Sequence, residues 1–284
     1  MRKVILLSFI IVILLISQSF ASFPPMLLNA RAVGLGEAYS ALSDDWGALV
    51  YNPAGLTYVD KINVGFTHLE MPESWTRVEF LGGVLPLNKI SLGFGASLKS
   101  IANSEELLFP FSENAFQVSV ASKVMPNLSL GATLYLYLTT LDTGSAQGFG
   151  VDLGAIYELN PNINLSLALY NPVSYLKWST GTVENVERKD VVLGGMFKLN
   201  LGNIPLKFLA DVSLLEKINF LNRVHVGTEV NFLPFLTLRT GYDGAKEGVT
   251  FGLGVNFSNL NFDYAFLYTQ ALTPQHVISL SGKF

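Results

Sequence analysis

The chain has 284 residues, of which 50% are hydrophobic and 14% are charged; it contains no cysteine, and its formal net charge is −4. An average soluble domain has about 25% charged residues, and a polytopic helical membrane protein has several apolar runs of about 20 residues, so neither class fits a chain with a single apolar run at its N-terminus. The composition also excludes a disulfide framework and a cysteine metal site, and it disfavours a nucleic-acid partner.

Residues 1–21 have the pattern of a secretory signal peptide. Arg2 and Lys3 precede an apolar stretch at 4–16, and the small residues Ser19 and Ala21 follow it, which predicts cleavage before Ser22. The alternative is a membrane anchor. We disfavour it because the apolar stretch is too short to span about 30 Å of hydrocarbon comfortably.

Residues 22–58 show no two-residue period and are predicted to form an N-terminal plug, or hatch. The segment 32–42 is glycine-rich and weakly helical in pattern, and residues 43–45 (Ser-Asp-Asp) are expected to cap a short helix over 46–51. Asn52-Pro53-Ala54-Gly55 then ends the helix. The alternative is a flexible tail, which the apolar content of the segment disfavours.

Residues 59–284 alternate between apolar and polar side chains, as successive residues of a strand point to opposite faces. The segment 128–138 is an example, with leucines on one face and Ser, Thr and Tyr on the other. Fourteen such segments are predicted, near 60–68, 76–85, 89–99, 114–124, 127–139, 148–158, 162–170, 190–199, 204–214, 222–232, 235–242, 247–257, 259–269 and 275–284.

The connections between these segments alternate in length. Every second one is tight, and longer ones are expected at 100–113, 140–147 and 171–189. Short turns at one end and long loops at the other are typical of an outer-membrane β-barrel. We therefore predict an all-β, transmembrane antiparallel barrel of fourteen strands in the outer membrane. A secreted sandwich or a lipocalin-like barrel is the alternative.

The polar faces of the strands are expected to line the barrel interior, because a charge facing lipid at mid-membrane costs about 2–4 kcal/mol for Arg or Lys. Aligning two strands around the turn at 233–234 places Glu229 opposite Arg239, His225 opposite Asp243 and Phe232 beside Leu236. With Asp263, these charged residues form the predicted lumen wall (His225, Glu229, Arg239, Asp263). They could form a charged relay for a solute. We favour the alternative, in which they form ion pairs that neutralise the charge of a water-exposed lumen wall.

Two apolar patches are predicted in the long loops. The first contains Leu107, Leu108, Phe109 and Phe111, and the second contains Tyr175 and Trp178. Exposed apolar patches can collect an apolar ligand or dock a partner. The alternative is that these loops lean on the membrane interface or fold into the barrel mouth.

No catalytic, metal-binding or cofactor-binding pattern is recognisable. Gly34-Leu35-Gly36 lacks the preceding strand and the third glycine of a dinucleotide fingerprint. We therefore expect no enzymatic activity, no metal and no cofactor. The strand 276–284 ends in Phe284, which resembles the C-terminal signal that barrel-assembly machinery recognises in its substrates.

Residues 29–45 and 48–56 resemble the start of the FadL/PorV-type superfamily of outer-membrane proteins. The resemblance rests on Arg31, Gly34, Gly36, Asp44, Asp45, Asn52, Pro53, Ala54 and Gly55, and it extends to 148–155, 238–242 and 276–284. It implies a fourteen-stranded barrel with an N-terminal hatch, whose matching residues would form the gate.

The resemblance also implies one of two functions, since the superfamily has two branches. One branch passes hydrophobic molecules such as long-chain fatty acids across the outer membrane, and we expect this function. The other, PorV/PorQ-like branch serves the secretion or surface attachment of other proteins, and the compact loops of this chain resemble that branch. Outer-membrane lipid, an apolar solute and secreted proteins are the expected partners.

Overall fold

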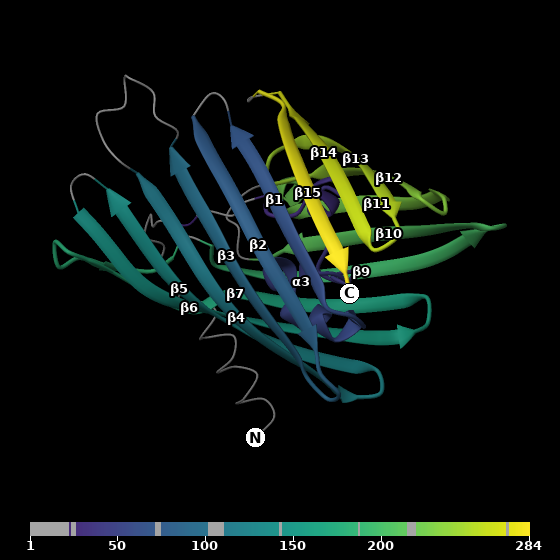
Figure 1. The fold of residues 1–284 in the computed structure, drawn as a ribbon, viewed down its shortest axis with the longest axis horizontal. Helices are drawn as coiled ribbons and strands as arrows, with labels where there is room; N and C mark the ends of the chain where they lie inside the picture. The colour runs from purple at the N-terminus through teal and green to yellow at the C-terminus, as the bar shows by residue number, and fades with distance from the viewer. Residues whose placement is uncertain are drawn as a thin grey trace.

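The computed structural model describes residue 23 and residues 27–71, 75–101, 111–141, 144–186, 188–214, 220–270 and 273–284. Within these residues, fourteen long antiparallel strands form one closed ring (Figure 1). A two-residue strand, β8 (Val183–Glu184), pairs with β7 outside the ring. The ring strands are β1 (Asn63–Met71), β2 (Thr76–Pro86), β3 (Ser91–Ile101), β4 (Ser112–Met125), β5 (Leu128–Leu141), β6 (Gly144–Asn160), β7 (Ile163–Trp178), β9 (Asp190–Leu201), β10 (Ile204–Ser213), β11 (Val224–Leu233), β12 (Leu236–Asp243), β13 (Gly248–Phe257), β14 (Leu260–Thr269) and β15 (Gln275–Lys283).

The ring closes where the last strand meets the first. Asn63 of β1 pairs with Lys283 of β15, and every other ring strand pairs with its neighbours in sequence. Each ring strand pairs on both edges, so the ring itself has no open edge. The predicted all-β, fourteen-stranded antiparallel barrel is confirmed.

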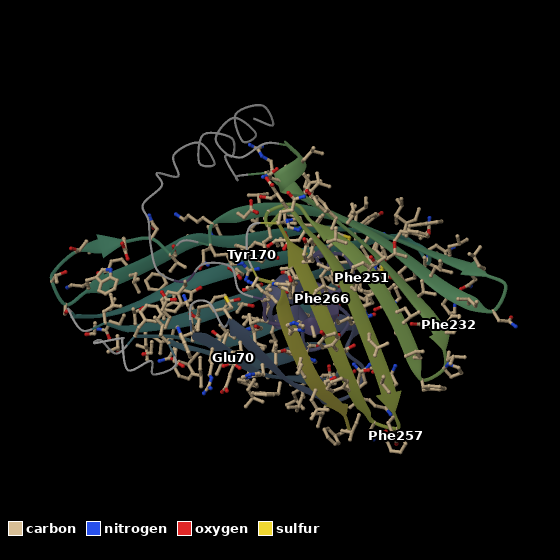
Figure 2. The ribbon with its side chains drawn as sticks, turned by 90° about the horizontal axis from the view of Figure 1, so that it is seen from above. Glu70, Tyr170, Phe232, Phe251, Phe257 and Phe266 are labelled. Atoms are coloured by element: carbon tan, nitrogen blue, oxygen red, sulfur yellow. The ribbon has the colours of Figure 1, made fainter. Side chains whose placement is uncertain are left out.

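The side chains alternate between the two faces of the barrel wall as the sequence predicts. On β5, Leu134 is 57% exposed whereas its neighbour Thr133 is 1% exposed. Phe232, Phe251 and Phe257 point away from the barrel (Figure 2). The outer surface is therefore apolar and the inner surface polar, the arrangement that a barrel surrounded by lipid requires.

Residues 27–59, called here the inner segment, lie against the inner face of this wall. They contain the helix α2 (Ala30–Val33), the helix α3 (Ala48–Tyr51) and the 3-10 helix η1 (Pro53–Tyr58). The helix α2 contacts β13, β14 and β15, and η1 contacts β4, β5 and β6, across the ring. The largest fully buried side chains include Trp46, Tyr39, Leu35, Leu42, Leu49 and Leu56 of this segment. The described core of the protein is thus built around the inner segment.

The local structure of the inner segment differs from the sequence prediction. Helix covers only Ala30–Val33 of the first helical region, and the second helix begins at Ala48 with Gly47 as its N-cap and no side-chain cap. The predicted cap from residues 43–45 is confirmed only in part: Asp45 Oδ1 accepts the backbone N–H of Gly47 at 2.7 Å, whereas Asp44 and the other oxygen of Asp45 bind the guanidinium of Arg31. A charge-assisted hydrogen bond is stronger than a neutral one, so the arginine takes these carboxylates.

Two of the three predicted long loops are shorter than expected. The connection between β5 and β6 is reduced to residues 142–143, because the two strands stay paired up to Leu141 and Gly144. The strand β7 continues to Trp178, so Tyr175 and Trp178 are strand residues and their assignment to a loop is wrong. Pro172 lies at an irregularity in the pairing of β6 and β7, between the pair Val151–Val173 and the pair Leu153–Leu169. Because a bulge tolerates proline, Pro172 does not end the strand.

The register predicted for β11 and β12 is largely confirmed. Glu229 pairs with Arg239 and His225 pairs with Asp243. The expected pair of Phe232 with Leu236 is wrong, since Leu233 pairs with Leu236 after a shift beyond Asn231. A bulge absorbs one residue at the turn without changing the face of the residues before it.

The predicted signal peptide at 1–21 and the loop residues Leu107, Leu108 and Phe109 lie outside the described residues. Among the described residues, no helix is both long and apolar enough to cross a membrane. The short 3-10 helix η3 (Phe220–Arg223) precedes β11.

Candidate functional site

A polar cavity of about 210 Å³ opens at the end of the barrel where the tight turns lie. The turns at 234–235 and 258–259 border it, together with the first and last strands. Its walls carry both charges and amides. The lining residues are Arg31, Asp44, Asp45, Asn63, Lys207, Glu229, Asn231, Thr237, Arg239, Asn256, Asn261, Ser281 and Lys283. A cavity of this volume and polarity holds several water molecules.

Arg31 of α2 is the centre of a network of ion pairs at the floor of the polar cavity. Its Nε and Nη2 atoms lie 2.8 and 3.0 Å from the two carboxylate oxygens of Glu229. Its Nη1 atom lies 2.6 Å from Oδ1 of Asp44 and 2.9 Å from Oδ2 of Asp45. One guanidinium therefore joins two turns of the inner segment to strand β11.

The barrel wall extends this network. Arg239 Nε lies 2.8 Å from Glu229 Oε2, and its Nη1 lies 2.6 Å from Asp263 Oδ1. Lys207 Nζ lies 2.7 Å from Glu229 Oε1. Glu229 thus faces three cations, and each buried charge has an opposite charge beside it, which is the condition under which charges are tolerated in an interior.

The network changes the acidity of Asp44. Burial alone would raise the pKa of this carboxyl, but the positive charges of Arg31 and Lys207 hold the pKa below its ordinary value of 3.8. The pKa of Glu37, in an earlier turn of the inner segment, is shifted in the opposite direction. Burial raises its pKa above the ordinary value of 4.5, with Lys246 lowering it and Asp243 raising it further.

His225, the fourth residue of the predicted lumen wall, lies apart from this network. Its Nδ1 atom is 2.9 Å from the carbonyl oxygen of Gly36 and 3.5 Å from Oδ1 of Asp243. The structure therefore brings Glu229, Arg239 and Asp263 together with Arg31, whereas His225 contacts a different turn of the inner segment.

The glycines of the hatch motif allow close approach between the inner segment and the wall. A Cβ atom on Gly34 would lie 2.9 Å from the Cα of Gly252, and Gly36, with a φ of 64°, lies against the backbone of Tyr242. Glycine is the one residue that enters both the left-handed conformation and such a contact without strain. These glycines fix the position of the chain against the wall.

The Asn-Pro-Ala-Gly motif anchors the other half of the inner segment. Asn52 accepts a hydrogen bond from the backbone N–H of Ala54 at 3.1 Å and donates to the carbonyl of Ser40 at 3.0 Å. Pro53 packs against Gly131 of β5, where a Cβ atom would lie 2.3 Å from the Pro53 carbonyl carbon. Gly55 lies equally close to Ser43. The motif therefore forms a capped, tightly packed turn.

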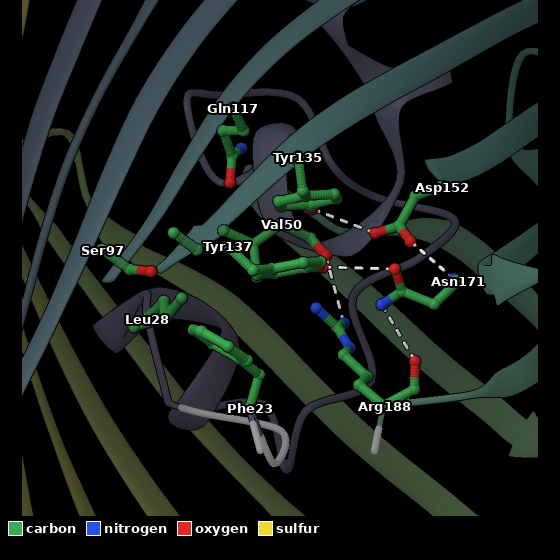
Figure 3. A pocket seen from close by; sticks show the side chains of 11 residues that line it. Phe23, Leu28, Val50, Ser97, Gln117, Tyr135, Tyr137, Asp152, Asn171 and Arg188 are labelled. Atoms are coloured by element: carbon green, nitrogen blue, oxygen red, sulfur yellow. Dashed lines mark hydrogen bonds between the residues drawn. The ribbon is translucent and has the colours of Figure 1, made fainter. Parts of the chain in front are cut away.

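An aromatic pocket lies toward the opposite end of the barrel (Figure 3). The rings of Tyr135 and Tyr137 stack with centroids 5.4 Å apart, and the ring of Phe23 lies 4.5 Å from that of Tyr137. Phe23 is buried and its backbone N–H donates to Glu113 at 3.1 Å. With Phe23 in place, the remaining volume is about 40 Å³, which is room for little more than one water molecule.

A partly buried arginine borders the aromatic pocket. Arg188, from the connection between β8 and β9, lies with its guanidinium carbon 3.8 Å above the ring of Tyr170 and donates to the Val50 carbonyl at 3.1 Å. Within the described residues, no carboxylate lies within ion-pair distance of it. The guanidinium therefore offers donors that no neighbouring carboxylate has taken.

The irregularity in β7 forms the side wall of the aromatic pocket. Asn171, with a φ of 45°, donates its backbone N–H to Asp152 Oδ1 at 2.8 Å and accepts from the Tyr137 hydroxyl at 3.2 Å. Asn171 Nδ2 also donates to the Arg188 carbonyl at 3.0 Å. Side-chain hydrogen bonds here replace ladder hydrogen bonds between the strands β6 and β7.

Phe111, Tyr175 and Trp178 are the residues of the two predicted apolar patches that lie within the described part of the chain, and each contacts a different neighbour. Phe111 lies under Lys99, whose Nζ is 5.1 Å from the ring centroid. Tyr175 stacks on Phe149 at 6.0 Å, and Trp178 donates its Nε1–H to Glu184 at 2.7 Å. The residues that do line a pocket, Phe23 and Arg188 above all, escaped the prediction because isolated residues outside the strands carry no periodic signal.

Several solved structures of other proteins have a similar fold. The toluene transporter TodX of Pseudomonas putida is 15% identical, with a TM-score of 0.61 over 89% of this chain and 97% of that chain. The monoaromatic hydrocarbon channel CymD is 14% identical, with a TM-score of 0.64 over 90% and 97%. A FadL homologue of Pseudomonas aeruginosa is 12% identical, with a TM-score of 0.59 over 93% and 99%.

These similarities show that the chain has the FadL-type barrel fold, as the sequence resemblance implies. No protein-family model matches the sequence. No curated protein sequence matches it either. Among the described residues, no group of three or more His, Asp or Glu side chains could hold a metal ion.

Proposed function

We propose that the protein passes small hydrophobic molecules across the outer membrane, and that the aromatic pocket is where such a molecule binds. The observation that carries the proposal is the ring of Phe23, which sits between Tyr137 and the pocket wall as an apolar ligand would. The similar folds of a toluene transporter and a monoaromatic hydrocarbon channel support it. The tight-turn end faces the periplasm in this proposal, as is usual for such barrels.

Phe23 must leave the pocket for a solute to enter. The space beside it is small. One hydrogen bond to Glu113, the ring contact with Tyr137 and packing within a buried apolar cluster hold Phe23 in place. A solute that stacks on Tyr137 replaces the ring contact that Phe23 loses. The apolar part of the solute then replaces the packing that Phe23 gives to the buried cluster.

Arg188 favours a solute with an acidic head group. A partly buried guanidinium beside an aromatic pocket gains a charge-assisted hydrogen bond when a carboxylate binds. The present partners of Arg188 are a carbonyl and an aromatic face. Long-chain fatty acids combine such a carboxylate with an apolar chain. We propose them as the cargo in preference to neutral hydrocarbons.

The inner segment, with its hatch motif, is the barrier on the axial route in this proposal. Beyond it lies the polar cavity, with charged side chains that an apolar solute would have to desolvate. The irregularity at Tyr170–Pro172 offers a sideways route instead, because side-chain bonds hold the wall together there. We propose that the solute leaves between β6 and β7 into the membrane.

The alternative function is the secretion or attachment of other proteins. This function requires exposed loops as a docking surface. The predicted loop 171–189, which contains the patch of Tyr175 and Trp178, was one of two candidate docking loops, with 100–113 as the other. About half of that range is strand. The remainder folds back onto the barrel, where β8 pairs with β7. Val186 is buried there, and Arg188 donates a hydrogen bond to the inner segment. We therefore favour solute passage.

The test is uptake of a fluorescent long-chain fatty acid and of toluene into vesicles that contain the purified barrel. Arg188→Gln should reduce fatty-acid uptake at low concentration about tenfold or more, the value of one charge-assisted hydrogen bond, and leave toluene uptake unchanged. Arg77→Gln, on an exposed pair with Glu70, is the control. Equal uptake of fatty acid by all three proteins, or by vesicles without protein, would count against the proposal.

A further inference from the structure

One wall of the polar cavity carries polar side chains that make no contact needed by the fold. Asn256 of β13, Asn261 of β14 and Ser281 of β15 are registered with one another across three neighbouring strands. Lys283 lies two positions after Ser281, and alternate residues of a strand share a face. All four line the cavity, but the amide of Asn261 donates to Asp263. We call the other three, Asn256, Ser281 and Lys283, the donor row.

The side chains of the donor row have no partner in the described part of the protein. No hydrogen bond or ion pair joins the side chain of Asn256, Ser281 or Lys283 to another described residue. Asn63, which is registered with Lys283 across β1 and β15, is different, because its Oδ1 accepts the backbone N–H of Trp46 at 2.8 Å. Asn63 thus holds the inner segment, whereas the donor row keeps its hydrogen-bonding capacity for water or a ligand.

The carboxylates that line the polar cavity are bound by other cations. Arg31 holds all three of them, at 2.6 Å from Asp44, 2.9 Å from Asp45 and 2.8 Å from Glu229. Within the described residues, no carboxylate lies within ion-pair distance of Lys283. The charge of Lys283 is therefore open to an anion from outside the protein.

The charge of the whole cavity is balanced, so any preference for an anion is local to the donor row. The lining contains four cationic side chains (Arg31, Lys207, Arg239, Lys283) and three carboxylates (Asp44, Asp45, Glu229). Asp263, bound to Arg239 behind the lining, supplies the fourth negative charge. A ligand is then selected by charge-assisted hydrogen bonds from the donor row and not by net attraction.

The donor row requires a ligand that accepts hydrogen bonds. An ammonium donates three hydrogen bonds and accepts none, and the hydroxyl of Ser281 and the amide of Asn256 can donate to the same group as Lys283. Phosphate offers four oxygens that point in different directions. The cavity of about 210 Å³ has room for several water molecules, and hence for an ion of this size.

We propose that the polar cavity binds a small oxyanion of the phosphate class, either free phosphate or the phosphate group of a small polar ester. Lys283, Ser281 and Asn256 donate hydrogen bonds to its oxygens. The site is distinct from the aromatic pocket, and the proposal does not rest on solute passage. Because the site is formed only in the folded barrel, the bound anion also stabilises the fold by mass action.

The experiment is equilibrium dialysis of radiolabelled inorganic phosphate against the full barrel in dodecyl maltoside, a detergent without charge. The wild type should bind phosphate saturably, and Lys283→Gln should lower the affinity about tenfold or more, the value of one charge-assisted hydrogen bond. Lys283→Arg keeps the charge and should retain most of the binding. The matched control is Lys61→Gln, which removes an exposed positive charge at the same end but outside the lining, and it should bind like the wild type.

A double variant tests the donor row without changing the charge of the cavity. Asn256→Ala/Ser281→Ala removes two neutral donors and should lower phosphate affinity about fivefold. It keeps the proposal testable if Lys283→Gln does not fold, which the migration of unheated samples on a gel reveals. Competition then identifies the source of the oxyanion. Glycerol phosphate displaces the label more strongly than inorganic phosphate if the ligand is an ester, and more weakly if it is the free ion.

Three results would overturn the proposal. The first is the absence of saturable phosphate binding by the wild type, which would mean that the cavity holds water only. The second is an equal loss in Lys283→Gln and Lys61→Gln, and the third is displacement of the label by choline, a cation. Because no fatty acid is present in these measurements, their failure leaves the proposed transport function untouched.

Discussion

Arg31 of α2 and Glu229 of β11 form a two-point ion pair between the inner segment and the barrel wall, with N–O distances of 2.8 and 3.0 Å. The two residues are 198 positions apart in sequence. Two parallel hydrogen bonds fix the orientation of the guanidinium as well as its distance. The pair therefore sets where the inner segment begins relative to the wall.

Glu229→Gln is expected to destabilise the barrel by about 3–5 kcal/mol, because it leaves buried cations without their carboxylate. Arg31, Lys207 and Arg239 would then repel one another around a neutral amide. Denaturant unfolding in vesicles, followed by tryptophan fluorescence, measures the loss.

Glu79→Gln is the control for that substitution. Glu79 is half exposed and lies 3.7 Å from His68, and an exposed pair of this kind contributes less than about 1 kcal/mol. Similar losses in the two variants would show that the central network does not hold the inner segment.

Gly131→Ala is expected to push the inner segment away from the wall. The added Cβ would lie 2.3 Å from the backbone of Pro53, and overpacking of this kind costs about 1–3 kcal/mol. In planar bilayers the variant should show a steady ion conductance above that of the wild type, since the displaced turn opens a path for water.

Gly195→Ala is the matched substitution, because a Cβ atom there meets nothing within 4 Å. It should conduct like the wild type. If the two alanine variants behave alike, the Asn-Pro-Ala-Gly turn is not the seal of the lumen.

The strands were predictable because a membrane barrel repeats one rule at every strand. Alternation fixed the strand number and the faces, and the turn at 233–234 fixed the pairing of Glu229 with Arg239. The prediction of the strand ends failed where one residue type is compatible with two local structures. Pro172 resembles a strand end, but it lies at an irregularity that lets β7 continue to Trp178.

The candidate site was predictable only in part. The hatch motif and the charged wall could be read from the sequence, yet nothing in it joins Arg31 to Glu229 across 198 positions. Phe23 and Arg188 are single residues in irregular segments, so only the folded chain shows that they share a pocket.

Stability should fall as the pH rises through the raised pKa of Glu37. A buried carboxyl with a raised pKa stabilises the fold fully below its ordinary value of 4.5, where it is protonated in both states, and this contribution is lost as the carboxyl ionises. Glu37→Gln should therefore lack this loss and be more stable than the wild type above that window. Unfolding midpoints measured across pH for both proteins provide the test, and parallel curves would contradict it.

Asp44→Asn should change the pH profile in the opposite direction. The pKa of Asp44 is lowered, so its contribution is present above the ordinary value of 3.8 and is lost as the pH falls below it. The asparagine variant should be less stable than the wild type near neutral pH and should approach it in acid. A difference that does not shrink in acid would assign the effect to packing instead of charge.

A disulfide across the β7 irregularity should stop solute passage if the solute leaves sideways. The chain has no cysteine, so Val151→Cys/Val173→Cys, on a registered pair beside the irregularity, introduces one defined cross-link. The oxidised variant is expected to lose most fatty-acid uptake and to regain it on reduction. Val118→Cys/Leu134→Cys, a registered pair on β4 and β5, should transport in both states because the wall there is continuous. Full uptake by the oxidised 151–173 variant would exclude the route between β6 and β7 and direct attention to the inner segment as the moving part.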